Sequence, residues 1–439
     1  MPNNWKTYKL GDLIQHQKGF AFKSEWYQEK GSYVVRVSDT TDNSIDISTC
    51  NKIDNHLASR YQNFNLKHND IVIATVGSWP PNYSSVVGKV IKVPKQANGA
   101  LLNQNAVRLR TADGELFDQS FIYYLMKSNN FLNYIVNSAQ GSANQASIKL
   151  TDIFNYEFLL PCIAIQRNIA SILSAIDDKI ELNLQMNKTL EEMAMTLYKH
   201  WFVDFGPFQN GEFVDSELGM IPKDWEVKRV DAITNFIDPH PSHRAPEIEE
   251  NGYPFAGIGD IDEMGNINVS KARQIGIDAV EKQEKSYLIN DKSIGFGRVG
   301  TVGKVVRLRP QSFRYSISPT MAVINAISEE YSELSYYMVK SDGFLTQVYN
   351  NQTGSTRPTI GIQTLRELKV VLPKDINQIK SFRELVRNFY EMGDSLNCET
   401  QILTTLRDTL LPKLISGEVR VKEAETILER VFPIKTGTK

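Results

Sequence analysis

The amino-acid sequence predicts a mixed α/β (α+β) protein with two tandem domains, each followed by a long helix, and with the two helices packed as an antiparallel coiled coil. Three observations lead to this prediction. Segments of residues 1–161 recur within residues 223–373, which indicates an internal repeat with pseudo-twofold symmetry. Each copy closes with a short apolar run that ends at a proline. A helical spacing of apolar residues follows each proline.

The repeat is visible in five pairs of segments that occur in the same order in both copies. They are WKTYKLGDLI (5–14) with WEVKRVDAIT (225–234), NDIVIATVG (69–77) with NDKSIGFGRVG (290–300), VVGKVIKV (86–93) with TVGKVVRL (301–308), FIYYLMKSNNFLNYI (121–135) with LSYYMVKSDGFLTQV (334–348), and GSANQASIKLTDIFNYEFLLP (141–161) with GSTRPTIGIQTLRELKVVLP (354–373). Alternating β-branched residues predict strands in the second and third pairs, and the spacing of aromatic residues predicts an amphipathic helix in the fourth.

After each closing proline the sequence predicts a helix long enough to extend beyond its own domain. In the first helix the apolar heptad positions hold Ile169, Leu173, Ile176, Ile180, Asn183, Asn187, Leu190, Ala194, Leu197 and Trp201. In the second they hold Phe382, Leu385, Phe389, Met392, Leu396, Glu399, Leu403, Leu406 and Leu410. Such stripes are typical of two helices that pack on each other, with polar residues at Asn183, Asn187 and Glu399 fixing the register. Packing of each helix on its own domain alone is the alternative.

These patterns set the expected boundaries of the domains. They are a first domain at 1–161, a long helix at 162–203, a Gly/Pro-punctuated linker at 204–222, a second domain at 223–373, a second long helix at 374–417 and a C-terminal tail at 418–439.

One stretch of the second copy imitates a nucleotide site. Gly295, Gly297 and Gly300 fit G-x-G-x-x-G, and short motifs typical of protein kinases occur at 204–206 (DFG) and 245–247 (APE). The order of the motifs is wrong for a kinase, and the glycines are followed by a strand-like GKVVRL instead of the helix that a dinucleotide site requires. The repeat explains the glycines better, because the first copy has SWPPNYSS in the same place.

Composition restricts the class of protein further. The net charge of −2 gives no general attraction to nucleic acid, so any binding of a polyanion must be local. No apolar run is long enough for a membrane span, and the three widely spaced cysteines suit a reducing cytoplasm and offer no zinc motif. His240 and His243 have no partner at metal-ligand spacing, so we expect no metal site.

Taken together, the ordered repeats resemble the specificity subunit of a Type I restriction-modification system. The resemblance covers the whole chain and includes LYKHWFVDFGPF (197–208), LLPKLISGEVRV (410–421), and Gln166 and Gln378 at the starts of the long helices. It implies that each domain is a target recognition domain for one half of a bipartite, asymmetric site in double-stranded DNA. It further implies that the helices set the gap and dock the methyltransferase subunits. Ile165 and Asn377 stand where the family often has glutamate.

The resemblance also implies that catalysis belongs to partner subunits. Two modification subunits would bring S-adenosylmethionine for methylation of adenine N6, and possible restriction subunits would bring ATP and Mg²⁺. The residues agree with a noncatalytic chain that binds no cofactor, because the nearest match to an adenine methyltransferase motif, Trp79-Pro80-Pro81-Asn82-Tyr83, lacks the amide or acid before the prolines.

Polar loop residues with fixed donor and acceptor patterns are the candidates for reading bases. In the first domain they are Arg36, Ser38, Thr40, Ser78, Trp79, Asn82, Tyr83, Asn103, Gln104, Asn105, Gln140, Asn144 and Gln145. In the second domain they are Ser242, His243, Arg244, Arg298, Thr301, Arg314, Tyr315, Ser316, Thr320, Ser355, Thr356 and Arg357. Lys18, Lys23, Lys89 and Lys304 are expected to contact phosphates, which position a protein without specifying bases. Each residue also has a purely structural interpretation, because such loops are typical of ordinary turns.

Two other functions stay open at this point. An orphan tandem DNA-binding protein would act without modification subunits, and gel filtration with those subunits would separate it from a specificity subunit. A nucleotide-using enzyme would be stabilised by nucleotide against thermal unfolding.

Overall fold

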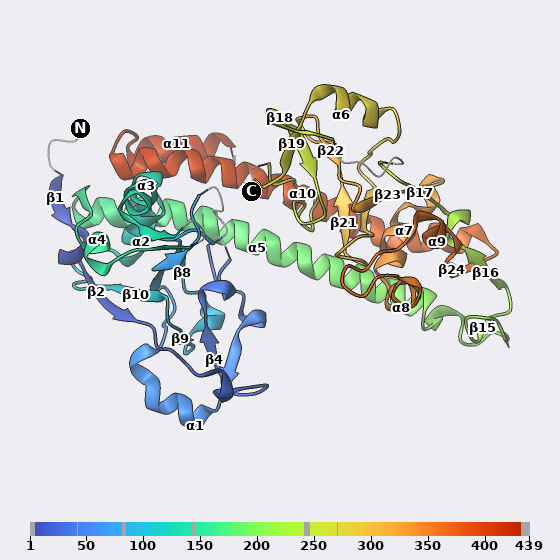
Figure 1. Ribbon diagram of the computed structural model, residues 1–439, viewed down its shortest axis with the longest axis horizontal. Coiled ribbons are helices and arrows are strands. Elements are labelled where there is room, and N and C mark those ends of the chain that lie inside the picture. Colours follow the sequence, from blue (N-terminus) through green and yellow to red (C-terminus); the bar gives the residue numbers. More distant parts are fainter. Residues whose placement is uncertain are drawn as a thin grey trace, which may run out of the picture. The chain divides into compact units, whose positions relative to one another are not determined.

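A computed structural model describes residues 5–41, 43–80, 85–142, 145–240, 246–269 and 271–431 (Figure 1). The chain divides into two compact units. The first unit contains Met1–Glu181 and Gln401–Lys439, and the second contains Leu182–Thr400. Each unit therefore holds one α/β domain together with a segment of both long helices. No helix among the described residues is both long and apolar enough to cross a membrane.

The first domain is built on a four-stranded antiparallel sheet with the order β2-β10-β6-β8. These strands are β2 (Ile14–Lys18), β10 (Ala106–Thr111), β6 (Ile71–Ala74) and β8 (Val90–Lys92). Val107 and Leu109 of β10 are buried with the helices α2 (Gln119–Lys127) and α3 (Asn129–Ser138), which contribute Phe121 and Phe131 to the same core. Because successive strand residues point to opposite faces, Arg108 and Arg110 lie on the other face.

Smaller sheets complete the first domain. A second four-stranded sheet has the order β3-β5-β4-β9 and a parallel β4–β9 pair. Its strands are β3 (Tyr27–Gln28), β5 (Asn51–Ile53), β4 (Ser32–Val35) and β9 (Leu101–Leu102). β1 (Lys6–Lys9) pairs with β13 (Glu157–Leu160) and thereby joins the start of the domain to its closing strand. Two short helices, α1 (Asn55–Ala58) and α4 (Leu150–Phe154), connect these parts.

The second domain repeats the main features of this topology. Its main sheet has the order β17-β23-β20-β21, formed by β17 (Thr234–Ile237), β23 (Met321–Ala326), β20 (Ser293–Gly297) and β21 (Val305–Leu308). β16 (Trp225–Arg229) pairs with β24 (Lys369–Pro373), as β1 pairs with β13. β18 (Ile248–Ala256) is flanked by antiparallel β19 (Arg273–Ile275) and parallel β22 (Ser316–Ile317), as β4 is by β5 and β9. The internal repeat predicted from the sequence is confirmed.

The helices of the second domain occupy matching places in the order of elements. α7 (Ser332–Lys340) and α8 (Asp342–Asn351) bury Leu334 and Phe344 against the main sheet, and α9 (Ile362–Glu367) leads into β24. α6 (Ile277–Glu284) packs on β18 and has only the short α1 in the corresponding stretch of the first domain. The linker contains a short turn of 3-10 helix and the paired strands β14 (Phe213–Val214) and β15 (Ile221–Pro222).

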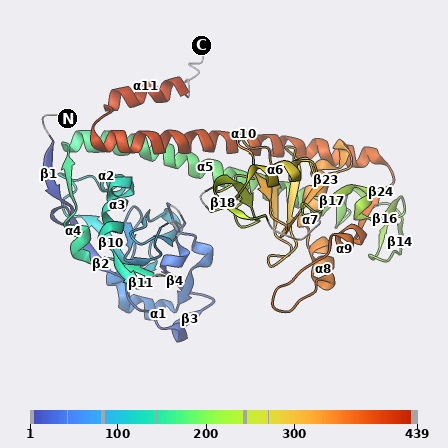
Figure 2. The same cartoon turned by 45° about the horizontal axis from the view of Figure 1, so that its top comes forward.

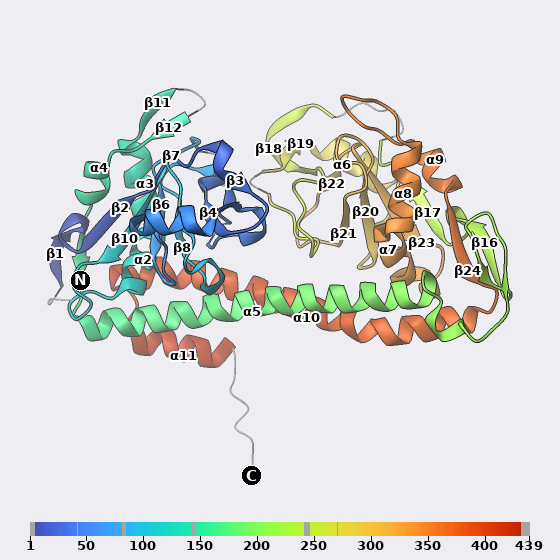
Figure 3. The ribbon, with the colours of Figure 1, turned by 90° about the horizontal axis from the view of Figure 1, so that it is seen from below.

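The long helices are α5 (Ile163–Phe202) and α10 (Ile376–Ser416), and within each unit they run alongside each other in Figure 3. Within the first unit Asp177 of α5 pairs with Arg407 of α10 at 3.0 Å. Within the second unit the Asn183 Nδ2 donates to Glu399 Oε2 at 2.8 Å. As numbers rise on one helix they fall on the other, so the predicted antiparallel pair is confirmed. Gln166 fixes the start of α5 by accepting from the Asp118 amide and donating to the Pro161 carbonyl.

Part of the predicted heptad register was wrong. Leu385 and Met392 are 47% and 51% exposed, whereas the next residues along, Val386 and Gly393, are buried. An α-helix drifts by about 20° per heptad relative to a 3.5-residue repeat, so a strict heptad leaves the buried stripe unless the helix supercoils. In the second unit α10 also packs on its own domain, which selects this shifted stripe.

The tail is helical over α11 (Val421–Val431), which turns back beside the end of α10 in Figure 2. Gly417 makes this turn possible with a φ of 73°, a left-handed conformation that favours glycine. Ala424 is fully buried in the core of the first unit, where Ile427 and Leu428 pack against it. α11 thus contributes to the first unit's core.

Candidate nucleic-acid interface

In the first domain, one loop and one hairpin bring four of the candidate residues together. β7 (Val76–Gly77) pairs with β12 (Gln145–Ser147), which pairs in turn with β11 (Gln140–Ser142). The loop after β7 carries Ser78 and Trp79, and the indole Nε1 of Trp79 donates to the Ser142 carbonyl at 2.8 Å. Gln140 and Gln145 are exposed on the hairpin. Trp79 therefore joins the loop to the hairpin, and the two amide side chains face solvent.

The second domain builds the same arrangement from different residues. Val299 bridges to Thr359, which also bridges to Thr353. The Gly300 amide donates to the Pro358 carbonyl at 2.8 Å and holds the loop against the turn at 354–358. Gly300 has a φ of +79°, so a side chain at this point would strain the backbone. Thr301 and the run Ser355, Thr356 and Arg357 are exposed beside this junction.

The two arginines of this second junction have different surroundings. Arg357 is exposed and forms no ion pair within the described part of the chain. Arg298 is only 7% exposed, and its Nη2 lies 3.0 Å from Asp238 Oδ2. Arg298 would have to leave this ion pair to reach a base, whereas Arg357 is already accessible.

His240 packs beside this ion pair. Its Nε2 lies 3.1 Å from the Ile317 carbonyl, and its backbone amide donates to Asp238. Burial lowers the pKa of His240, and the nearby Arg298 and Lys282 lower it further against the opposing effect of Asp238. The backbone amide of His240 thus helps to hold Asp238 in place, while the imidazole contacts the Ile317 carbonyl.

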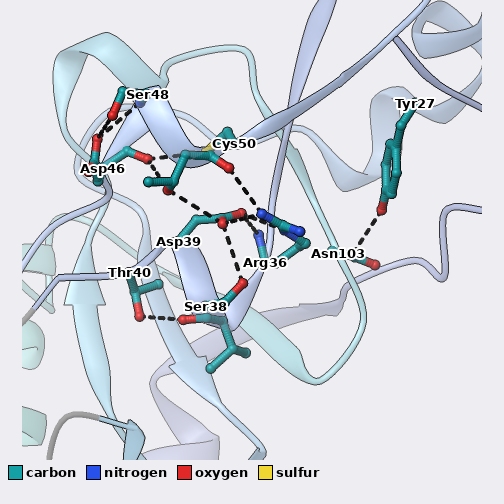
Figure 4. A network of polar contacts seen from close by, with 11 residues as sticks. Tyr27, Arg36, Ser38, Asp39, Thr40, Asp46, Ser48, Cys50 and Asn103 are labelled. Carbon is teal, nitrogen blue, oxygen red and sulfur yellow. Dashed lines mark hydrogen bonds and ion pairs between the residues drawn. The ribbon is translucent and has the colours of Figure 1, made fainter. Parts of the chain in front are cut away.

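Arg36, Ser38 and Thr40 belong to a different polar network, in the 3-10 turn after β4 (Figure 4). Arg36 Nε and Nη2 donate to the two oxygens of Asp39, a carboxylate that is only 2% exposed. This hydrogen bond raises the pKa of Arg36. The Thr40 hydroxyl donates to the Val37 carbonyl, and Ser38 is exposed.

Asn103, Gln104 and Asn105 form the turn between β9 and β10. The Asn103 Nδ2 donates to the Tyr27 hydroxyl at 3.3 Å (Figure 4). The Asn103 Oδ1 accepts from the Gln104 amide. Asn105 has a φ of 68°, the left-handed conformation that asparagine tolerates better than most residues. Gln104 and Asn105 are exposed, while Asn103 is buried as a brace of the turn.

The other candidates of the second domain are mostly engaged. Arg314 is exposed but paired with Glu284 and Glu281 on α6, and hydrogen bonding to Glu284 raises its pKa. The Tyr315 hydroxyl donates to the Arg309 carbonyl at 2.7 Å, and Ser316 is fully buried. The Thr320 hydroxyl shares a hydrogen bond with Ser318.

Three of the four lysines expected at phosphates are exposed, and Lys89 is half-buried. Lys23 lies 3.5 Å from Glu25, and Lys304 and Lys89 donate to the carbonyls of Ile258 and Thr40. Six candidates lie outside the described residues, namely Asn82, Tyr83, Asn144, Ser242, His243 and Arg244.

Sequence reasoning passed over Arg108 and Arg110 of β10. Both point away from the main core, and Arg110 pairs with Asp70 at 2.5 Å. The alternation in Ala106–Thr111, AVRLRT, is the signal that could have found them, because the two arginines share the face opposite Val107 and Leu109.

Comparisons with known proteins agree with this architecture. The MjaIX Type I restriction enzyme specificity subunit of Methanocaldococcus jannaschii is 31% identical over 333 residues, which cover 74% of each chain. The HindI Type I restriction enzyme specificity subunit of Haemophilus influenzae is 26% identical over 68% of this chain and 77% of its own. The crystal structure of a Type I restriction-modification S subunit from M. genitalium matches the fold with a TM-score of 0.52, at 16% identity, over 94% of this chain and 97% of that one.

The family model for the Type I restriction modification DNA specificity domain matches twice, at residues 2–192 and 222–386. Each match contains one copy of the repeated sheet with its loop and hairpin. The chain belongs to the family of Type I restriction-modification DNA specificity subunits.

Proposed function

We propose that this noncatalytic specificity subunit reads a bipartite, asymmetric site in double-stranded DNA, with each domain recognising one half. The observation that carries the proposal is the repeated junction of loop and hairpin. Both domains build it with the same backbone pairings, but Gln145 in the first domain stands where Arg357 lies in the second, and Gln140 stands where Thr353 lies. Amides pair best with adenine and arginine with guanine, so different side chains on one scaffold favour two different half-sites.

The long helices supply the spacing in this proposal. α5 and α10 are single helices of 40 and 41 residues that pair antiparallel within each unit. A helix advances about 1.5 Å per residue, so their length fixes a gap that the domains do not read. We also infer that exposed apolar residues of the pair, among them Leu184, Met193 and Ile402, dock the methyltransferase subunits.

Partner subunits would supply the chemistry, in the cytoplasm where the DNA is. Two modification subunits would hold S-adenosylmethionine for transfer of a methyl group to adenine N6. Restriction subunits, where present, would hold ATP and Mg²⁺. The role of this chain is to place a chosen adenine in front of the partner's site, and it needs no cofactor of its own for that task.

The deciding experiment is a genome-wide map of N6-methyladenine in the source strain, with and without this gene. We expect deletion to remove one bipartite, asymmetric motif and re-expression of the gene to restore it. If the map is unchanged while the modification subunits are shown to be expressed, the chain acts as an orphan tandem DNA-binding protein instead.

The spacer role has its own test in the same assay. One heptad added to α5, with a matching heptad in α10 to keep the pair in register, is expected to lengthen the unread gap of the methylated motif. Seven residues added to the linker 204–222, outside both helices, are the control and should leave the gap as it is. An unchanged gap in the helix variant would show that the helices do not act as the spacer.

A further inference from the structure

The first domain contains a polar cavity that lies apart from the junction of loop and hairpin. Its volume is about 400 Å³, which is within the range of small-ligand sites. The lining residues are Gln17, Gln62, Asn63, Asn65, Lys67, Arg108 and Arg110. They come from β2, β10 and the 3-10 helix Ser59–Phe64 with the segment after it, on the sheet face opposite α2 and α3.

The cavity carries positive charge that its own residues do not neutralise. Arg110 donates from Nε and Nη2 to both oxygens of Asp70, at 2.5 and 2.7 Å, so this pair is balanced. Among the described residues, Arg108 Nη1 donates only to the carbonyls of Asn63 and Asn65, at 3.2 and 2.5 Å. These carbonyls satisfy hydrogen bonds but bring no negative charge.

Arg108 also shares this environment with other cations. Burial lowers its pKa, and the neighbouring charge of Arg110 lowers it further against the opposing effect of Asp70. Lys67 adds an exposed ammonium at the rim of the cavity. A half-buried guanidinium without a counter-ion is costly, and an anion between Arg108 and Lys67 would remove that cost.

The second domain shows that the fold does not need these charges. In the first sheet Arg108 lies between Gln17 and Val72 of the neighbouring strands. At the equivalent point of the second sheet Val323 lies between Ile237 and Gly295. Val323 is therefore the counterpart of Arg108, and Ile237 is the counterpart of Gln17. Val323 is fully buried in an apolar cluster against which Ile237 packs. The same position is thus apolar core in one copy and a basic cavity in the other.

The ion pair of Asp70 and Arg110 is likewise replaced by uncharged residues in the second domain. Asp70 and Arg110 correspond to Ser293 and Asn325, which form a neutral hydrogen bond of 2.7 Å. The same fold thus accepts either charged or uncharged residues at these positions, so packing alone does not explain the arginines of the first domain. A function specific to the first domain is the better explanation.

We propose that this cavity binds a phosphate group, held between Arg108 and Lys67, with the amides of Gln17, Gln62 and Asn63 available as further donors. The ligand is a phosphodiester of the DNA strand that the first domain reads, in which case the inference rests on the proposed function, or a free nucleotide with the same phosphate chemistry. A phosphodiester here would anchor the first half-site from outside the junction of loop and hairpin.

The test uses the full-length chain, together with its modification subunits, and the variants Arg108→Gln and Lys67→Gln. Lys9→Gln removes the same charge from an exposed lysine on β1 and is the control. Binding is measured by fluorescence anisotropy on a duplex with the methylated motif and on a scrambled duplex, over a range of salt concentrations. Thermal midpoints are measured with inorganic phosphate and with adenosine monophosphate.

For a DNA phosphodiester we expect both variants to weaken both duplexes by the same factor, and each to reduce the slope of log K against log salt by about 0.9, while the control changes neither. A free nucleotide would instead raise the midpoint of the wild type but not of the variants, with DNA binding unchanged. Lys67 is exposed, so Lys67→Gln keeps the test valid if Arg108→Gln fails to fold.

If Arg108→Gln and Lys67→Gln behaved like the control Lys9→Gln in every assay, the cavity proposal would be overturned. That outcome differs from a failure of the proposed function, in which the wild-type complex itself would not distinguish the motif duplex from the scrambled one. In that case the midpoints with phosphate and nucleotide decide the cavity proposal on their own.

Discussion

The guanidinium of Arg307 lies 3.1 Å from the carboxylate of Glu191, inside the second unit where β21 meets α5. The Arg307 side chain is 7% exposed and also lies 3.4 Å from Asp394 of α10 and over the ring of Tyr390. Although burial opposes it, Lys340 and Arg307 together lower the pKa of Glu191 below its ordinary value. One arginine of the second domain is thereby tied to both long helices.

Removing the carboxylate of Glu191 is therefore expected to destabilise the second unit. Glu191→Gln should lower the free energy of unfolding by about 3 kcal/mol, because it leaves the buried charge of Arg307 only partly compensated. Urea denaturation measures the change. Glu226→Gln breaks an exposed pair with Lys228 and should cost less than about 1 kcal/mol. Equal losses in the two variants would mean that the buried pair contributes no more than a surface one.

For Asn187 of α5 we predict a gain in the free energy of unfolding, in contrast to the loss expected for Glu191→Gln. Asn187 is 7% exposed, and both polar atoms of its side chain lack a hydrogen-bond partner among the described residues. Asn187→Leu should raise the free energy of unfolding by about 1–2 kcal/mol, because it removes two unsatisfied buried groups. Thermal unfolding checks this, with Leu182→Asn at an exposed helix position as the neutral control. A lower midpoint for Asn187→Leu would show that the amide is needed in the helix pair.

Stability of the second domain should depend on the charge of His240. Its pKa in the folded protein lies below the ordinary value of 6.5, so the unfolded chain binds the proton more readily. The free energy of unfolding must then rise with pH between the pKa of His240 in the folded protein and 6.5, and it levels off above pH 6.5. Thermal midpoints between about pH 5 and 8 should show this rise for the wild type and lose part of it in His240→Gln. His56→Gln, an exposed histidine on α1, should follow the wild-type curve.

Variants of Arg357 and Arg298 test the proposed base reading against support of the fold. Arg357→Ala should relax preference at particular base pairs of the second half-site, because a good bidentate contact is worth about 1–3 kcal/mol. Methylation of a library of site variants by the reconstituted complex measures it. Arg298→Ala is expected to relax preference too, but it also leaves Asp238 without its ion pair and should lower stability. A loss that is equal on all sequences would make Arg357 a phosphate contact.

The repeat, its order of elements and the helix pair could be predicted because they depend on local patterns that occur twice. The register of α10 could not, since Val386 and Tyr390 are selected by packing on a domain that lies close in space. The surroundings of Arg298 escaped prediction for a related reason. Its partner Asp238 is 60 residues away, and only the fold brings them together. The residues of the basic cavity are likewise scattered from Gln17 to Arg110.

The way the junction of loop and hairpin is held has a consequence for how this protein can evolve. The Gly300 amide bonds to the Pro358 carbonyl, and the pairing of Thr353 with Thr359 closes the hairpin through backbone groups. Side chains at Ser355, Thr356 and Arg357 are left outside this bonding, so mutation can replace them with little loss of stability. Under the proposed function, a few exchanges at these positions would give the chain a new target in one half-site while selection retains the other half unchanged.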